Sequence, residues 1–202
     1  DPFHVFEIDA QGHCREHHEL VVAGWKDFIE PVFSGTRLIG VGVRDEIDSE
    51  QLVVSLYDLA NLDNPTPLLA RLELDGMAFG DGIATWDFRN AFRVLEGAAA
   101  VLAPGTQTLE TGLLLAPYAG GGYVDEGGAS FYAQRWGVQL FSFSDSTLTK
   151  RGAFEVGERV DRSFEVDDAT SANLGESQLA LFDKSYVDAP FARGTLDLAP
   201  EI

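Results

Sequence analysis

Residues 51–74, QLVVSLYDLANLDNPTPLLARLEL, contain the pattern that decides the fold class. A run rich in β-branched and aromatic residues, 52–57, ends at Asp58, and residues 61–65 (NLDNP) favour a turn. In the second run, 68–74, leucine and alanine at the even positions alternate with arginine and glutamate. Two runs with a period of two residues, joined by a turn, predict an antiparallel β-hairpin.

The same hairpin recurs along the chain. An aromatic residue marks the first run of each copy, at Phe6, Tyr57, Phe141 and Phe182. The second run follows 13 to 15 residues later, at Leu20, Leu72, Phe154 and Leu196. The copies are 51, 84 and 41 residues apart, and repeats of about 40–50 residues are typical of β-propeller blades. We interpret the widest spacing as one unit with an insertion of about 40 residues.

The pattern predicts an all-β fold in which residues 1–202 form a single segment, a β-propeller arc of about three and a half four-stranded antiparallel blades. The expected units are a partial blade over 1–22, a blade over 24–75, a blade with insertions over 86–156 and a blade over 158–199. The alternative is a compact β-sandwich that uses the same hairpins.

Two segments of the third unit are less regular. Residues 91–103 are rich in alanine and are also compatible with a short helix. Residues 119–128 are rich in glycine and predict a loop.

Charge and composition restrict the classes of partner. The chain has 33 acidic and 14 basic residues, a net charge of −19, which disfavours binding to nucleic acid and to membrane surfaces. No apolar run approaches the roughly 20 residues of a membrane span. Cys14 is the only cysteine, so no disulfide forms within the chain. The chain begins at Asp1 and its only methionine is Met77, so we interpret it as a processed fragment of a longer precursor.

Residues 25–32 (WKDFIEPV), 36–42 (TRLIGVG) and 56–59 (LYDL), with Asn64-Pro65 downstream, also carry a family resemblance. The chain resembles secreted and cell-surface bacterial and archaeal proteins whose β-propeller domain is distantly similar to WD40 repeats. The resemblance is best over residues 25–74. It implies a propeller fold, an extracytoplasmic location (secreted, cell-surface or periplasmic) and a scaffold or binding role, and it transfers no catalytic motif.

An arc of blades leaves two blade faces uncovered, and a blade needs neighbours on both faces. We therefore expect another polypeptide, from the same precursor, to supply the missing blades. The favoured function is a non-catalytic module that binds a protein or a polymer. Two alternatives stay open: a propeller-type hydrolase or lyase with a carboxylate-lined central channel, and a calcium-stabilised structural surface protein.

Three sets of residues are candidate sites. A calcium ion, the one cofactor considered, takes oxygen ligands from acidic loops such as the one with Asp45, Glu46, Asp48 and Glu50. The second candidate is a transition-metal site, because histidine and cysteine side chains bind such metals. Its residues are His13, Cys14, His17 and His18. Sugars stack on tryptophans, here Trp25, Trp86 and Trp136. The alternatives are a solvated acidic loop, an exposed turn and ordinary core packing. No nucleophile elbow, zinc-protease or P-loop motif occurs.

Overall fold

The computed structural model describes residues 3–20, 25–43, 51–64, 66–78, 91–126 and 129–198. Over these residues it contains 16 secondary-structure elements, and all of them are β-strands, which confirms the predicted all-β class. None of the described residues belongs to a helix that is long and apolar enough to cross a membrane. The first two strands, β1 (Phe3–Ile8) and β2 (Cys14–Leu20), form an antiparallel N-terminal hairpin.

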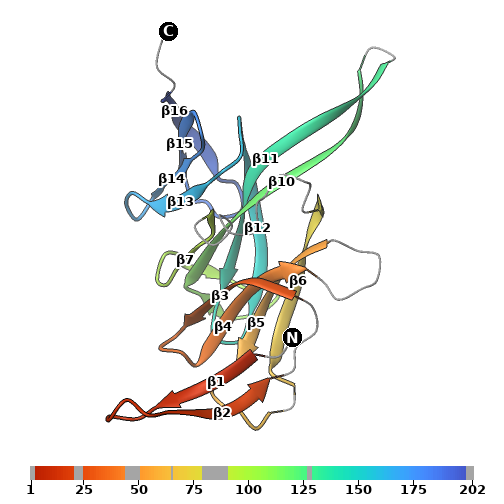
Figure 1. Cartoon of the computed structure of the whole chain (residues 1–202). Helices are drawn as coiled ribbons and strands as arrows, with labels where there is room; N and C mark the ends of the chain where they lie inside the picture. Colours follow the sequence, from red (N-terminus) through yellow and green to blue (C-terminus); the bar gives the residue numbers. More distant parts are fainter. Residues whose placement is uncertain are drawn as a thin grey trace.

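Three four-stranded antiparallel sheets follow the N-terminal hairpin (Figure 1). The first sheet consists of β3 (Trp25–Val32), β4 (Arg37–Val43), β5 (Gln51–Asp58) and β6 (Leu68–Ala78). The second consists of β7 (Arg93–Leu95), β10 (Gly112–Glu126), β11 (Ala129–Phe143) and β12 (Leu148–Val156). The third consists of β13 (Arg162–Glu165), β14 (Thr170–Leu174), β15 (Gln178–Asp183) and β16 (Phe191–Asp197).

Strands that follow one another within a sheet are hydrogen-bonded neighbours. The second sheet has one addition, because a short hairpin of β8 (Val101–Leu102) and β9 (Leu109–Glu110) is inserted between β7 and β10. The described strands thus form three open four-stranded sheets that follow one another along the chain.

The second sheet lies between the other two and buries both of its faces. Successive residues of a strand point to opposite faces. In β10, Leu114 and Ala116 lie in the core shared with the first sheet. Leu113 and Leu115 lie in the core shared with the third sheet. This explains why β10 has a continuous apolar run, whereas a half-exposed strand alternates.

Aromatic rings form the centre of both interfaces. Between the first and second sheets, Phe28 stacks on Phe92 with ring centroids 5.4 Å apart, and Phe33 meets Phe143 edge-on at 5.7 Å. Between the second and third sheets, Phe154 stacks on Phe182 at 3.6 Å. Such ring pairs add to the stability that burial of apolar area gives.

The structure corrects both irregular segments. Residues 93–103 contain β7, a turn and β8, so the helix considered for 91–103 is wrong beyond Ala91, the one residue of this range with helical geometry. Within 119–128 the predicted loop is also wrong, because β10 continues to Glu126 and β11 begins at Ala129. Glycine is tolerated there because β10 and β11 pair through their backbones, out to the pair Glu126 and Ala129.

The inserted residues of the second sheet therefore occupy two places. One is the β8–β9 hairpin. The other is the distal part of β10 and β11, which extends past the residues that pair with β7 and β12 and projects from the body as a two-stranded ribbon (Figure 1). The short third-sheet strand β14 lies within the polar segment 167–177, where the sequence left the choice between a short strand and a long loop.

Candidate functional site

One turn position recurs in the N-terminal hairpin and in all three sheets. A side-chain oxygen at the end of a strand accepts a hydrogen bond from the backbone N–H two residues later. The distances are 2.8–3.1 Å, and the accepting residues are Asp9, Asp58, Ser144 and Asp183. This turn position gives a common register in which the four units can be compared.

The common register moves the residue that marks the repeat by two positions in two of the four units. The residues directly before the turn position are Ile8, Tyr57, Phe143 and Phe182. The predicted Phe6 and Phe141 lie two residues earlier, on the same face of their strands. Because a shift of two residues preserves the face, a period-two pattern does not reveal it.

The alternate positions of the same strands point toward the following sheet. In the first sheet, Val54 and Leu56 of β5 and Leu72 of β6 pack into the core shared with the second sheet. The same register positions in the third sheet are Leu179, Leu181 and Leu196. Leu179 and Leu181 are partly exposed, and Leu196 is 58% exposed. Residues that another sheet covers in the first unit are thus uncovered in the third.

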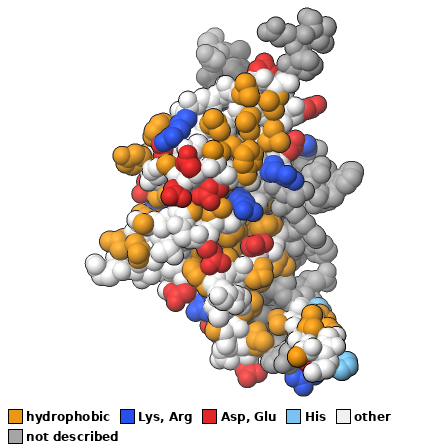
Figure 2. All heavy atoms as spheres, turned by 90° about the vertical axis from the view of Figure 1, so that its left-hand side faces the viewer, with side chains coloured by type: hydrophobic (Ala, Val, Ile, Leu, Met, Phe, Trp, Pro, Cys, Tyr) orange, Lys and Arg blue, Asp and Glu red, His pale blue; other side chains and the backbone are white. Residues whose placement is uncertain are grey.

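These leucines belong to what we call the outer face, the side of the third sheet that points away from the second. Phe182 points to the second sheet, so Leu181 and the residues paired with it point away. The apolar residues that this register places on the outer face are Phe164, Ala172, Leu174, Leu179, Leu181 and Leu196. Ala172 is fully buried, and the others are partly or mostly exposed. Figure 2 shows hydrophobic side chains gathered over the upper part of the molecule, where Figure 1 places β13–β16. Large exposed apolar patches mark interaction sites.

Two glycines on the forward faces of their sheets support the conclusion that the outer face is open. Gly152 lies at the bulge of β12, between the residues that pair with Gln139 and Phe141, and Gly194 of β16 pairs with Leu181. A Cβ atom on Gly152 would lie 2.5 Å from Pro190 Cδ and 2.6 Å from Asp188 O, because the β15–β16 turn packs there. A Cβ atom on Gly194 would meet no described atom within 4 Å. The space that the following sheet fills at Gly152 is empty at Gly194.

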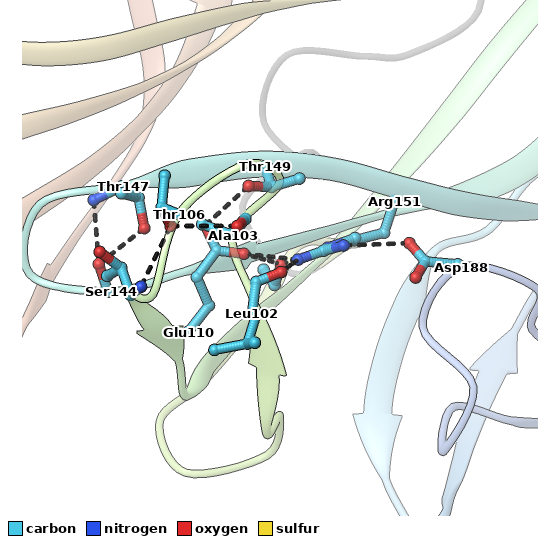
Figure 3. Close-up of polar contacts among 11 residues, drawn as sticks. Leu102, Ala103, Thr106, Glu110, Ser144, Thr147, Thr149, Arg151 and Asp188 are labelled. Atoms are coloured by element: carbon cyan, nitrogen blue, oxygen red, sulfur yellow. Dashed lines mark hydrogen bonds and ion pairs between the residues drawn. The ribbon is translucent and has the colours of Figure 1, made fainter.

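A buried polar network supports the interface of the second and third sheets (Figure 3). Arg151 Nη2 donates to Glu110 Oε2 at 2.9 Å, and both side chains are buried. Glu110 also accepts hydrogen bonds from Ser142 Oγ and, at 2.7 Å, from Thr149 Oγ1. A buried carboxylate requires this degree of pairing, because an unpaired one is strongly destabilising.

The same arginine reaches across to the third sheet. Arg151 Nη1 lies 3.2 Å from Asp188 Oδ1, in the β15–β16 turn. Arg151 lies at a bulge of β12, and Arg193 lies on the outer face at a bulge of β16 that is nearer to the turn. Arg193 Nη2 contacts Asp183 Oδ2 at 2.5 Å. This bond, followed by the one from Ser185 N–H, holds the pKa of the Asp183 carboxyl below its ordinary value.

A second uncovered face lies on the N-terminal hairpin. Phe6 is 54% exposed and Ile8 is 70% exposed. Their counterparts before the turn position in the three sheets are all buried, namely Tyr57, Phe143 and Phe182. The hairpin therefore exposes the face that, in the second and third sheets, packs against the preceding sheet.

A cavity of about 610 Å³ lies between residues 96–101 of the second sheet and residues 184–189 of the third. Lys184 lines it with a fully buried side chain. Its Nζ donates to Glu165 Oε1 at 2.9 Å and to Asp168 O at 2.5 Å. The buried ammonium is thus paired within its own sheet, and we interpret it as part of the packing of the turns.

The structure places only some of the predicted site residues. The residues outside the described part are Asp45, Glu46, Asp48, Glu50 and Trp86. His13 lies in the β1–β2 turn, with Nδ1 2.9 Å from Asp9 Oδ2, and Cys14 is exposed at the start of β2. No three His, Cys, Asp or Glu side chains converge within the described part of the chain. Both metal sites stay predictions.

The other predicted residues lie in strands. His17 and His18 are successive residues of β2, at the register shift where Val5 pairs with His18 and Phe6 pairs with Glu16. Trp25 begins β3, and Trp136 lies partly buried in β11 opposite Val156. Sugar binding by the tryptophans stays a prediction. The outer face was not predicted as a site from the sequence. Alignment of Leu179 and Leu181 with Val54 and Leu56 would have indicated it, because it shows that the last unit has apolar residues at positions where the first sheet meets a neighbour.

Comparisons with known proteins do not assign the chain to a family. No protein-family model matches it, and no curated protein matches it. The two uncovered faces are therefore the features of the molecule that bear on its function.

Proposed function

We propose that the chain is a non-catalytic protein-binding module, built as an arc of a β-propeller with three four-stranded blades and one half blade. The four-stranded antiparallel meander is the blade unit of propellers. Three such sheets pack face to face in sequence order, and the N-terminal hairpin has the same turn position. These features support blades rather than unrelated hairpins.

One observation carries the binding role. Positions that are buried or partly buried between the first and second sheets are less covered on the outer face of the third sheet, where Leu179 and Leu181 are partly exposed and Leu196 is 58% exposed. A repeat unit buries its apolar surface only against its neighbours, so an uncovered terminal face requires a polar cap or a partner. Leucine and phenylalanine on this face favour a partner.

The proposed partner is another polypeptide that supplies further blades and covers the outer face. Rings of four to eight blades are typical, so an arc of about three and a half leaves room for more. The net charge of −19 favours a protein over nucleic acid as the partner. The extracytoplasmic location is a proposal that rests on the family resemblance described above.

Structure determination of the natively purified assembly, by cryo-electron microscopy or crystallography, tests this function. We expect sheets that radiate about a shared axis, with β13–β16 packed against strands of another polypeptide molecule. A native assembly in which the outer face of β13–β16 is open to solvent would contradict the proposal. So would strands that do not share an axis.

A further inference from the structure

We propose that the outer face of the third sheet receives the N-terminal hairpin of a second copy of this chain, so that copies associate head to tail. This inference rests on the proposed function and specifies its partner. Each uncovered face is the counterpart of a face that is buried elsewhere in the same molecule. The two internal interfaces therefore serve as templates for the interface between copies.

At both internal interfaces, the later sheet contributes the residue before its turn position to the contact with the earlier sheet. In the second sheet, Phe143 precedes the turn position and packs against the first sheet. In the third sheet, Phe182 has the same place and stacks on Phe154 of the second. In the N-terminal hairpin, Ile8 precedes the turn position, and Phe6 is its neighbour on the same face. The hairpin thus presents an apolar pair where the template requires one.

The receiving surface matches the hairpin in extent. On the outer face, Leu179 and Leu181 come from β15 and Leu196 from β16. These strands have six and seven residues, and β1 and β2 also have six and seven. Strands β1 and β2 of one copy therefore cover β15 and β16 of the other. In this arrangement the hairpin occupies the position that the last two strands of a fourth sheet would have.

The two faces meet only between copies. In Figure 1 the N-terminal hairpin lies at one end of the molecule and β13–β16 lie at the other, with the first and second sheets between them. Figure 2 also places the upper hydrophobic patch far from the pale-blue histidines that mark the hairpin. A hairpin that docks on β15–β16 thus belongs to another molecule.

Complementation between two variants tests the inference. The acceptor variant has Leu181→Asp and Leu196→Asp, and the donor variant has Phe6→Asp and Ile8→Asp. We expect the unmodified chain to self-associate as its concentration rises in sedimentation equilibrium and native mass spectrometry. Each variant alone is expected to be monomeric. Their equimolar mixture should form a one-to-one dimer that does not grow, because only one productive interface remains.

A matched control is Leu109→Asp, which places the same charge on a leucine that is 52% exposed in the β8–β9 hairpin, away from both faces. This variant should associate like the unmodified chain, and circular dichroism should show all variants folded. Three results would overturn the inference: an unmodified chain that is monomeric at every concentration, a mixture that stays monomeric, or a Leu109 variant that also loses association. If the native assembly nevertheless covers the outer face with a sheet of a different polypeptide, only this inference fails and the proposed function stands.

Discussion

Arg151 and Glu110 are the residues on which the interface of the second and third sheets depends most. Glu110 is fully buried, and its only ion pair among the described residues is with Arg151. We expect Arg151→Met to lower the free energy of unfolding by about 3–5 kcal/mol, because it leaves a buried carboxylate without its counter-ion. Urea titration measures this loss.

The double variant Arg151→Met, Glu110→Leu is the control. Replacement of a buried pair by apolar residues is often nearly neutral, so the double variant should recover most of the lost stability. A double variant that is no more stable than Arg151→Met would mean that the stranded carboxylate is not the source of the cost.

Asp183 gives the third sheet a pH-dependent contribution. Its pKa is lowered by the Arg193 side chain and then by the Ser185 N–H. A carboxyl with a lowered pKa stabilises the fold fully above its unfolded pKa of about 3.9 and loses this contribution as pH falls through the folded pKa. We expect Asp183→Asn to be less stable than the unmodified chain at pH 7 and to show a shallower loss of stability below about pH 4.

Urea midpoints between neutral and acidic pH measure this effect. Glu176→Gln removes a charge at an exposed carboxylate that makes no hydrogen bond with the described residues, and it serves as the control. Equal slopes for Asp183→Asn and the unmodified chain would show that Asp183 is not a source of the acid sensitivity.

At the scale of elements, Gly152 and Gly194 distinguish a covered strand from an uncovered one. We expect Gly152→Ala to destabilise the chain by about 1–3 kcal/mol, because the new methyl group overlaps backbone and ring atoms of the β15–β16 turn. Gly194→Ala should change stability by less than about 0.5 kcal/mol, since its site is open. Thermal unfolding of the two variants at low concentration makes the comparison, and equal losses would contradict the assignment of β16 to an uncovered face.

Much of the element order could be predicted from the sequence. The alternating runs at 51–74 and 178–198 became the hairpins β5–β6 and β15–β16, because period-two patterning and turn residues are local signals. The ribbon of β10 and β11 could not be predicted, because glycine-rich residues carry no alternating pattern. The two-residue shift at Phe141 was also invisible, since it preserves the face of the strand.

The candidate site was harder to predict than the fold. Leu179, Leu181 and Leu196 are of a residue type that is common in protein cores, and sequence alone does not say whether a neighbouring sheet covers them. Their exposure depends on what packs against β15 and β16, which is a property of the assembled sheets. Chemical reasoning favoured the acidic loop and the histidine cluster instead, because ligand-forming residue types are visible in a sequence and an uncovered apolar face is not.

At the scale of the whole molecule, the protection of backbone amides from hydrogen exchange should increase with the number of covered faces of a sheet. The second sheet is covered on both faces and the third on one. Amide groups open to exchange more readily where few apolar contacts hold the backbone. In dilute solution, we expect slower amide hydrogen exchange in residues 113–118 and 138–143 than in residues 178–183, as measured by mass spectrometry. Faster exchange in the second sheet than in the third would contradict the layered arrangement.

The recurrent turn position has a consequence for how such a chain grows. In both the second and the third sheet, the aromatic residue before the turn position packs against the preceding sheet. A unit added by tandem duplication would therefore meet its neighbour through the same anchor residue, and the polypeptide would lengthen by one layer.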